Sequence, residues 1–377
     1  MTMKEIRNIV ETYNSIDHTT EKVALASVVN VEESSYRRIG ARMLVRSSGL
    51  WVGGISGGCL EGDALRRSQQ AIFRNKPSLV VYDTMEDDKN QIGVGLGCNG
   101  RIEVLLSPVD PSDPENEIEL LRKIENADGP SLMLKVIDAG KDPELLGKNE
   151  LVFPVSDDVA FAGSDPAQLK ACLSEVIEKK KARIFEVTSE PAGDIRILIE
   201  FIRPETRLVI VGDNYDVNAM VGIASEMGWD ITVVGKAKKL SADVFKKASS
   251  IVDKADAASV PVNDYTAVIL MSHDYKTDKT LLPVFLEKKP AYIGMLGPKK
   301  RFQKIENELG NLTEEDMDVI HSPTGLEIGA ESPQEIALSI LSEIVAVFRG
   351  KTGSSLKHKE GTIHEREQTV IPASSLF

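Results

Sequence analysis

Residues 209–217 read Val-Ile-Val-Gly-Asp-Asn-Tyr-Asp-Val, a β-branched run that stops at a glycine before a polar turn. The pattern predicts a buried strand that ends at Gly212 and a helix that begins near Val217. The apolar residues that follow recur at helical spacing, as packing on a sheet requires: Val217, Met220, Val221 and Ala224. The stretch therefore predicts one strand–turn–helix unit of a parallel sheet.

Strands and helices continue to alternate beyond this unit. We expect strands at residues 231–234, 250–252, 266–271 and 291–295 and helices near residues 242–248 and 277–287. Such alternation is typical of the α/β class, in which helices cover both faces of a parallel sheet. Because Pro204 precedes the first strand, we assign residues 204–350 to a Rossmann-like domain with a doubly wound parallel sheet.

The turn after the first strand departs from the dinucleotide-binding pattern. That pattern is G-x-G-x-x-G, with an acidic residue at the end of the second strand to bind the ribose. Here Asn214 and Val217 replace the second and third glycines, and Gly235 and Lys236 stand where the acidic residue belongs. The degenerate fingerprint argues against ordinary NAD(P) binding.

Ligands of open parallel sheets bind outside the carboxyl ends of the strands. The binding candidates at these ends are Gly212, Asn214, His273 and Asp274. His273 with Asp274 and Asp278 could perform acid–base chemistry, although a lone histidine is more often structural. The three cations at residues 299–301 could hold a phosphate or simply begin a solvated helix.

The chain before residue 204 has a different pattern. Residues 1–108 alternate short Val- and Leu-rich runs with two amphipathic segments, near residues 3–15 and 60–73, which predicts an α+β unit. An acidic, proline-punctuated connector leads into a middle segment, residues 109–203, which we attach to this N-terminal domain. Residues 351–377 are polar and are predicted to form a disordered tail.

Two glycine-rich loops of the N-terminal domain each contain a cysteine. Glycine amides can approach an anion closely, and a thiolate is stabilised at the start of a helix, as expected for Cys59. The binding candidates in these loops are Gly57, Gly58, Cys59, Glu61, Gly97, Cys98, Asn99 and Gly100. The alternative is that both loops are structural turns, and the sequence leaves open whether they meet in space.

Residues 54–58 also match G-x-S-x-G, the nucleophile elbow of hydrolases. Ser56 comes early, however, and no downstream Asp and His pair is distinguished by its context, so a serine hydrolase is disfavoured. The three cysteines are too scattered for a disulfide framework, and no histidine lies at metal-ligand spacing from them. We therefore expect reduced thiols, no catalytic residue and no metal site.

Charge and hydropathy limit the classes of partner. The chain has 377 residues with a net charge of −13, which disfavours a sequence-independent grip on nucleic acid. No apolar run approaches the roughly 18 residues of a membrane span, and the N-terminus is charged where a signal peptide would be apolar. We expect a cytoplasmic protein with no membrane partner.

Several motifs in both domains resemble the xanthine dehydrogenase accessory factor (XdhC/CoxI) family. In the N-terminal domain they are residues 40–45, 57–61 and 97–105, and in the C-terminal domain residues 272–274, 292–297 and 321–336. They follow the family's order from about residue 20 to residue 350. The chain departs from the family's usual G-x-G-H-x-G at residues 212–217 and has Tyr275 where relatives often have a second histidine.

The resemblance implies a maturation factor that binds molybdenum cofactor, protects it while a sulfur ligand is installed, and passes it to a xanthine dehydrogenase-type hydroxylase. It implies a chaperone more than a metabolic enzyme, a homodimer, and Cys59 and Cys98 as contacts to the cofactor. A cysteine desulfurase is a further candidate partner. Two alternatives stay open: an NAD(P)-dependent oxidoreductase that uses the C-terminal sheet, and a non-catalytic dimeric interaction protein.

Overall fold

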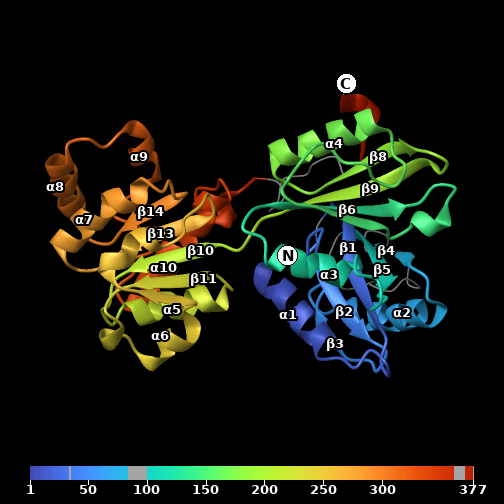
Figure 1. Cartoon of the computed structure of the whole chain (residues 1–377), viewed down its shortest axis with the longest axis horizontal. Helices are drawn as coiled ribbons and strands as arrows, with labels where there is room; N and C mark the ends of the chain where they lie inside the picture. Colours follow the sequence, from blue (N-terminus) through green and yellow to red (C-terminus); the bar gives the residue numbers. More distant parts are fainter. Residues whose placement is uncertain (34, 84–99, 361–369, 377) are drawn as a thin grey trace. The chain divides into compact units, whose positions relative to one another are not determined.

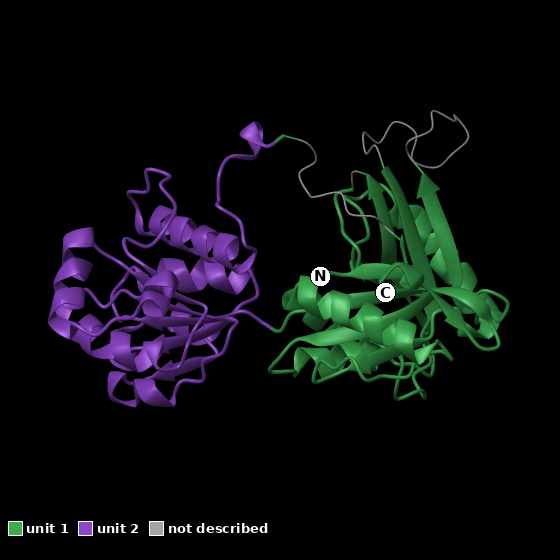
Figure 2. Cartoon of the chain, turned by 90° about the horizontal axis from the view of Figure 1, so that it is seen from above, with its two compact units in different colours: residues 1–204, 360–377 green, residues 205–359 purple. Residues whose placement is uncertain are grey.

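The computed structural model describes residues 1–33, 35–83, 100–360 and 370–376. The chain divides into two compact units, which we call unit 1 (residues 1–204 with 360–377) and unit 2 (residues 205–359). In the sequence, unit 2 lies between the two segments that form unit 1, and Figure 2 colours the units separately. Each unit has its own sheets and its own hydrophobic cores.

Unit 1 contains two five-stranded sheets, A and B. Sheet A is antiparallel with the order β3-β2-β1-β5-β4. Its strands are β1 (Val23–Glu33), β2 (Arg42–Arg46), β3 (Trp51–Gly53), β4 (Ser78–Asp83) and β5 (Gly100–Pro108). Helix α2 (Glu61–Arg74) packs on one face, and α1 (Met3–Asn14), α3 (Glu117–Glu125) and sheet B pack on the other (Figure 1).

Sheet B has the order β16-β8-β9-β6-β7. Its strands are β6 (Ser131–Asp138), β7 (Asn149–Val152), β8 (Arg183–Ser189), β9 (Gly193–Ile202) and β16 (Val370–Pro372). Helix α4 (Pro166–Lys179) covers one face, and Val29 and Leu105 of sheet A pack against the other. The sequence pattern missed β7, because four residues of mixed polarity carry too little periodicity.

The chain end corrects one expectation. We expected residues 351–377 to be disordered, but Val370–Pro372 form strand β16, which pairs in parallel with β8. Ala373 is buried, and Leu376 packs against the core beneath α4. A short apolar run at the end of a polar tail was enough to complete a sheet edge, and average composition hides such a run.

Unit 2 is built on sheet C, which is parallel throughout and has the order β12-β11-β10-β13-β14-β15. Its strands are β10 (Arg207–Val211), β11 (Asp230–Val234), β12 (Ser250–Val252), β13 (Thr266–Leu270), β14 (Tyr292–Met295) and β15 (Ile320–His321). The order reverses between β10 and β13, which is the topological switch point of a doubly wound sheet. The predicted Rossmann-like α/β architecture is confirmed.

Helices cover both faces of sheet C. On one face lie α5 (Val217–Glu226), α6 (Ala242–Lys247) and α10 (Pro333–Phe348), and on the other α7 (Tyr275–Leu286) and α8 (Lys299–Leu309). Leu208 and Ile210 of β10 enter the first core, whereas Val209 and Val211 enter the second. The short helix α9 (Glu314–Val319) precedes β15.

Helix α10 has the termini that the sequence predicts. Ser332 is its N-cap, and the side chain of Glu335 completes the capping box with Pro333 in the first turn. Gly350, with φ of 61°, lies just beyond the C-cap Arg349. Among the described residues no helix combines the length and the apolar character that crossing a bilayer requires.

Candidate functional site

The turn between β3 and α2 carries Cys59, and Ser56 gives this turn its shape. The Ser56 Oγ accepts the backbone N–H groups of Gly58 at 3.2 Å, Cys59 at 3.1 Å and Leu60 at 3.1 Å. The amides that we expected to be open to an anion are therefore already engaged at Gly58 and Cys59. Ser56 acts here as an acceptor at the centre of a turn, which does not favour the nucleophile elbow interpretation.

Glu61 fastens the same turn from the first position of α2. Its carboxylate accepts the N–H groups of Ile55 at 3.1 Å and Ser56 at 2.8 Å, and the Ser56 hydroxyl also donates to it. Burial alone would raise the pKa of Glu61, but these hydrogen bonds outweigh it and lower the pKa. Glu61 is thus committed to the loop's own donors.

Cys59 is a free and half-buried cysteine in this turn. Gly57 lies beside Tyr36, since a Cβ added at Gly57 would be 3.5 Å from the Tyr36 ring, and Tyr36 itself is 76% exposed. Cys59 follows Gly57 by two residues in the same turn. The turn can therefore offer a thiol for sulfur coordination, and the exposed Tyr36 ring beside Gly57 offers a stacking face to a flat ligand.

The second glycine-rich loop falls largely outside the described residues, which include none of Gly97, Cys98 and Asn99. Gly100 is the first residue of β5, is buried and pairs with Glu33 of β1. Its place is therefore inside sheet A. A site shared by Cys59 and Cys98 stays a prediction.

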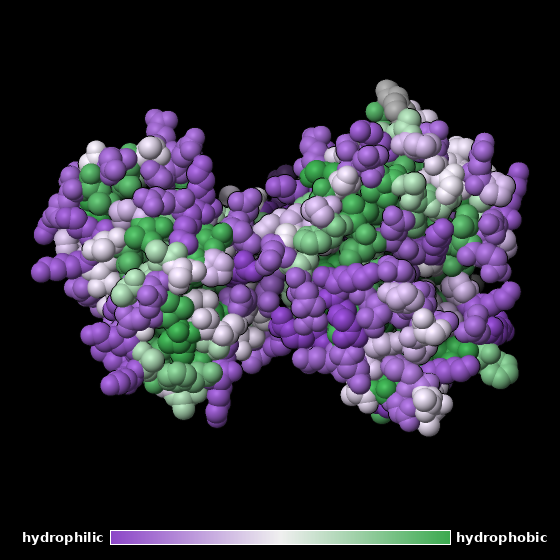
Figure 3. Space-filling view, viewed as in Figure 1, coloured by the Kyte–Doolittle hydropathy of each residue, from purple (hydrophilic) through white to green (hydrophobic). Residues whose placement is uncertain are grey.

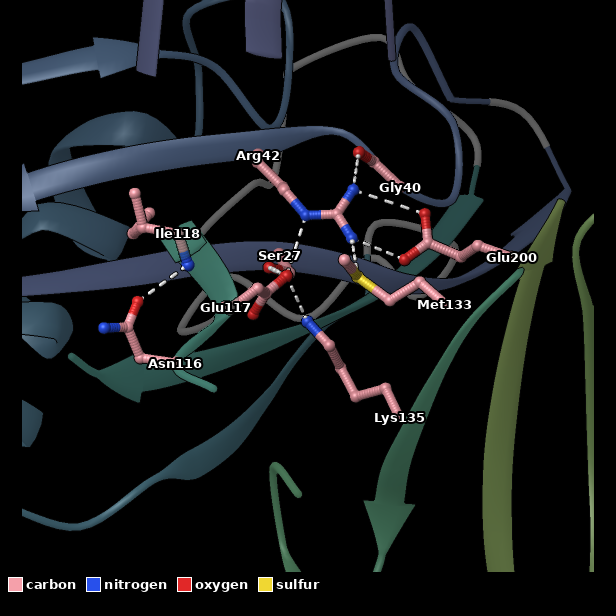
Figure 4. A network of polar contacts seen from close by, with 9 residues as sticks. All are labelled: Ser27, Gly40, Arg42, Asn116, Glu117, Ile118, Met133, Lys135 and Glu200. Carbon is pink, nitrogen blue, oxygen red and sulfur yellow. Dashed lines mark hydrogen bonds and ion pairs between the residues drawn. The ribbon is translucent and has the colours of Figure 1, made fainter. Parts of the chain in front are cut away.

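Unit 1 also encloses a buried ion cluster that the sequence analysis did not single out (Figure 4). The Arg42 guanidinium bonds Glu117 Oε1 through Nε at 2.8 Å and Glu200 Oε1 through Nη2 at 2.6 Å. Its Nη1 donates to the Gly40 carbonyl at 2.7 Å. Lys135 donates to the same Glu117 oxygen at 2.6 Å, so β2, α3, β6 and β9 meet in one network.

The charges of this cluster balance, and its pKa values follow from that balance. Burial would raise the pKa of Glu117, but the nearby Lys135 and Arg42 lower it to about 2. Burial would lower the pKa of Arg42, but Glu200 and Glu117 raise it instead. A signal was present in the sequence, because Arg42 interrupts an apolar run from Ala41 to Val45 and such a residue in a strand needs a buried partner.

In unit 2 the predicted candidates gather at the switch point of sheet C. Gly212 follows β10, and the Asn214 side chain donates to the Ser272 carbonyl at 3.2 Å, linking the ends of β10 and β13. His273 and Asp274 follow β13. Structure and sequence agree on which loops meet here, since parallel strands end at one edge.

The partner of His273 differs from the one we expected. Its Nε2 lies 2.6 Å from Asp216 Oδ2, at the start of α5, and His273 adopts a left-handed φ of 57°. Asp274 caps α7 by accepting the Thr277 N–H at 3.0 Å. His273 is therefore paired with Asp216, whereas Asp274 serves as a helix cap.

Asp278 also belongs to a different group than expected. It is buried, accepts the Ser272 hydroxyl, and pairs with Arg301 Nη2 at 2.6 Å. Burial raises the pKa of Asp278 against the opposing effects of Ser272 and Arg301. One of the three cations at residues 299–301 is thus already neutralised inside the fold.

A second charged cluster lies at the ends of β10, β11 and β12. The buried Asp213 carboxylate pairs with Lys239 Nζ at 2.9 Å and Lys254 Nζ at 3.3 Å, and it accepts the Lys236 N–H at 3.1 Å. Burial would raise the pKa of Asp213, but these three donors lower it to about 2. The sequence analysis did not choose Asp213 as a candidate because Asp213 stands at the first x of the G-x-G-x-x-G pattern, where that pattern specifies no residue.

The motif at residues 321–336 is fixed by Tyr292 and Glu343. The Tyr292 hydroxyl contacts Glu343 and lies 2.6 Å from Thr324 Oγ1, and the Gly325 N–H donates to Glu343 Oε2 at 2.8 Å. His321 stacks on the Tyr292 ring with a centroid distance of 4.3 Å. These contacts give the polar residues of this motif hydrogen-bond partners beside a buried strand.

Two family models match the chain, one in each unit. The model described as the XdhC and CoxI family matches residues 18–83, and the model described as the XdhC Rossmann domain matches residues 208–344. Together they cover more than half of the chain. This chain belongs to the XdhC and CoxI family.

Two similar proteins extend over most of this XdhC and CoxI chain. A probable xanthine dehydrogenase subunit of Bacillus subtilis (strain 168) is 24% identical over 329 residues, which are 86% of this chain and 93% of that protein. The molybdenum cofactor insertion chaperone PaoD of Escherichia coli (strain K12) is 24% identical over 356 residues, 93% of this chain and 87% of PaoD.

A solved structure agrees with the fold of this XdhC and CoxI member. A crystal structure described as a xanthine dehydrogenase from Bacillus halodurans gives a TM-score of 0.71 at 29% sequence identity. The match covers 94% of this chain and 98% of the other. Of the clusters above, the XdhC and CoxI match contains Cys59, and the XdhC Rossmann match contains Asp213 and His273.

Proposed function

We propose that this chain binds molybdenum cofactor and delivers it to a xanthine dehydrogenase-type molybdenum hydroxylase as a maturation factor. The observation that carries the proposal is the match of both units to XdhC family models, together with likeness over 93% of the chain to a molybdenum cofactor insertion chaperone. The cofactor is cargo in this role, so no turnover by this chain is required.

Cys59 is the residue of unit 1 that we propose to contact the cargo. A thiolate is a soft ligand that suits molybdenum, and the turn around Cys59 is held by Ser56 and Glu61 through bonds from its own amides. The exposed ring of Tyr36 offers a stacking face for a pterin beside the same turn. Because the Gly58 and Cys59 amides are already hydrogen-bonded to Ser56, we propose that the thiol and the ring, rather than the backbone amides, contact the cofactor.

The test is anaerobic purification from cells that make the cofactor, followed by molybdenum and pterin analysis of the bound fraction. We expect Cys59→Ala to retain much less cofactor than the wild type. The matched control is Cys172→Ala, because Cys172 is fully buried and burial raises the pKa of its thiol to about 12.

Each variant is checked for folding by circular dichroism before the cofactor is measured. Equal retention by the wild type and Cys59→Ala would remove Cys59 from the site, and Cys98→Ala in parallel would then test the other loop. Absence of cofactor from every folded sample would contradict the carrier role itself.

The proposal extends to partners and location. We propose a cytoplasmic homodimer that docks on its client enzyme and on a cysteine desulfurase. Figure 3 displays hydrophobic surface over the part of unit 2 that contains α5, α6 and α10, and Leu338 of α10 is 49% exposed. Sedimentation of the wild type and Leu338→Glu tests the dimer, and a monomeric wild type would contradict it.

A further inference from the structure

We propose that unit 2 binds a phosphate monoester at the carboxyl ends of β10, β11 and β12, through the amines of Lys239 and Lys254. We call this group, together with Asp213, the lysine cluster. The inference uses only residues of unit 2 and does not involve Cys59, and only its pterin-cargo alternative rests on the proposed function.

Convergence of amines from separate elements is the first support. Lys239 ends the short helix after β11, and Lys254 begins the one after β12, yet both ammonium groups contact the same Asp213 carboxylate. An ammonium has three N–H donors, so pairing with Asp213 leaves donors on each. Asp213 thus holds two cations in register, as a phosphate with several oxygens requires.

Access from solvent is the second support. The Asp213 side chain is 3% exposed, whereas the Lys239 side chain is 53% exposed and that of Lys254 is 25% exposed. The carboxylate is therefore buried, whereas the Lys239 side chain is half exposed and the Lys254 side chain is partly exposed. A ligand could reach the positive side of this cluster without meeting the negative one.

Local charge is the third support. Residues 236–254 contain six lysines and two aspartates, a net charge of +4 in a chain whose net charge is −13. Asp213 also faces this stretch, and three carboxylates still cannot neutralise six amines. Lys236 and Lys238 are exposed beside the cluster. This concentration of cations in an acidic protein favours one class of ligand, an anion.

The position in the sheet identifies which anion. In dinucleotide-binding sheets the end of the second strand carries a carboxylate that accepts ribose hydroxyls. Here that end is Gly235, where an added Cβ would lie 2.7 Å from the Gly212 carbonyl oxygen, so no side chain fits. Amines stand where the acceptor would be, and amines recognise a phosphate rather than a free ribose hydroxyl.

The neighbouring turn argues for a single phosphate rather than a pyrophosphate. A pyrophosphate would bind at the start of α5, but Asp216 occupies that place and its Oδ1 is buried without a hydrogen-bond partner among the described residues. Its negative charge opposes an anion there. The ligand class is therefore a phosphate monoester, from a 2′-phosphorylated adenine nucleotide or from the phosphate of a pterin cargo.

The experiment is isothermal titration of the full-length protein at low salt with two probes, adenosine 2′-monophosphate and adenosine. We expect saturable binding of the monophosphate only, weakened about tenfold or more in Lys239→Ala/Lys254→Ala, because two charge-assisted bonds are lost. The double arginine variant keeps both charges and should keep binding. The control is Lys247→Ala, whose lysine pairs with Asp243 on α6.

Titration with inorganic phosphate separates the two sources. Adenosine 2′-monophosphate binding far tighter than inorganic phosphate indicates the nucleotide, while comparable binding of both indicates a phosphate site that serves the pterin cargo. The proposal is overturned if neither adenosine 2′-monophosphate nor inorganic phosphate saturates at about 10 mM, a concentration at which even weak sites fill. It is also overturned if Lys247→Ala loses as much binding as the double variant while both remain folded by circular dichroism.

Discussion

Each unit contains a carboxylate held between two cations, and the two clusters differ in how far their cations are exposed to solvent. The side chains of Glu117 in unit 1 and Asp213 in unit 2 are both 3% exposed, and the pKa of each is lowered to about 2. The cations around Glu117 are 0–1% exposed, whereas Lys239 is 53% exposed. We therefore call the Glu117 cluster closed, because its cations are buried, and the Asp213 cluster open, because solvent reaches Lys239.

The closed cluster is best understood as a joint between sheets A and B. Arg42 of β2 bonds both Glu117 and Glu200. A Cβ at Gly40 would lie 2.3 Å from Glu200 Oε2, so the backbone at Gly40 packs directly against the cluster. Burying four charges is costly, and only complete pairing offsets the cost. A ligand has no route into such a cluster, whereas the lysine cluster keeps its donors at the surface.

The largest expected effect follows from breaking the joint. Arg42→Ala leaves the buried Glu200 without its arginine partner and leaves Glu117 with Lys135 alone, so it should lower the free energy of unfolding by roughly 3–5 kcal/mol. Urea denaturation followed by circular dichroism measures it. Lys254→Ala is the comparison in unit 2, and a loss as large in that variant would contradict the distinction between closed and open clusters.

Acid should weaken the joint in a defined window. The pKa of Glu117 falls from its usual 4.5 to about 2 on folding, so its contribution is complete above pH 4.5 and is lost as the pH falls towards 2. The shift corresponds to about 3 kcal/mol. Unfolding curves of the wild type and Glu117→Gln between pH 7 and pH 2.5 should converge at the acid end, and parallel curves would rule out this role for Glu117.

A smaller effect is expected at the open cluster. Asp213→Asn keeps an oxygen to accept the Lys236 N–H but loses its charge, so roughly 1–2 kcal/mol of stability should be lost. Thermal unfolding measures the change against the wild type. A loss equal to that of Arg42→Ala would mean that the lysine cluster is a structural joint as well.

The fold was predictable where periodicity and punctuation agree. The β10–α5 unit and the capping box at Ser332 and Glu335 carry complete local signals, and the structure contains both. Strand β16 escaped prediction because Val370–Pro372 form a strand only by pairing with the distant β8. Local sequence does not contain that partner.

The site was predictable only to the level of loops. The sequence placed His273 at a strand end and suggested Asp274 and Asp278 as its partners, whereas the structure pairs it with Asp216, because the partner depends on which loop crosses the switch point. It likewise marked the Cys59 turn but did not show that the Ser56 hydroxyl accepts three of its backbone amides. Side-chain hydrogen bonds of this kind depend on how the loops pack, which local sequence does not determine.

Salt should give the smallest effect and the sharpest contrast between the clusters. Raising the ionic strength from about 0.05 M to about 0.5 M shortens the screening length to a few ångströms and acts mainly on charges that water reaches. Because Lys239 is half exposed, the stability difference between the wild type and Asp213→Asn should shrink with salt. The difference between the wild type and Arg42→Ala should stay constant, since Arg42 is 1% exposed. Urea unfolding at both ionic strengths measures the two differences, and equal salt dependence would mean that water reaches both clusters alike.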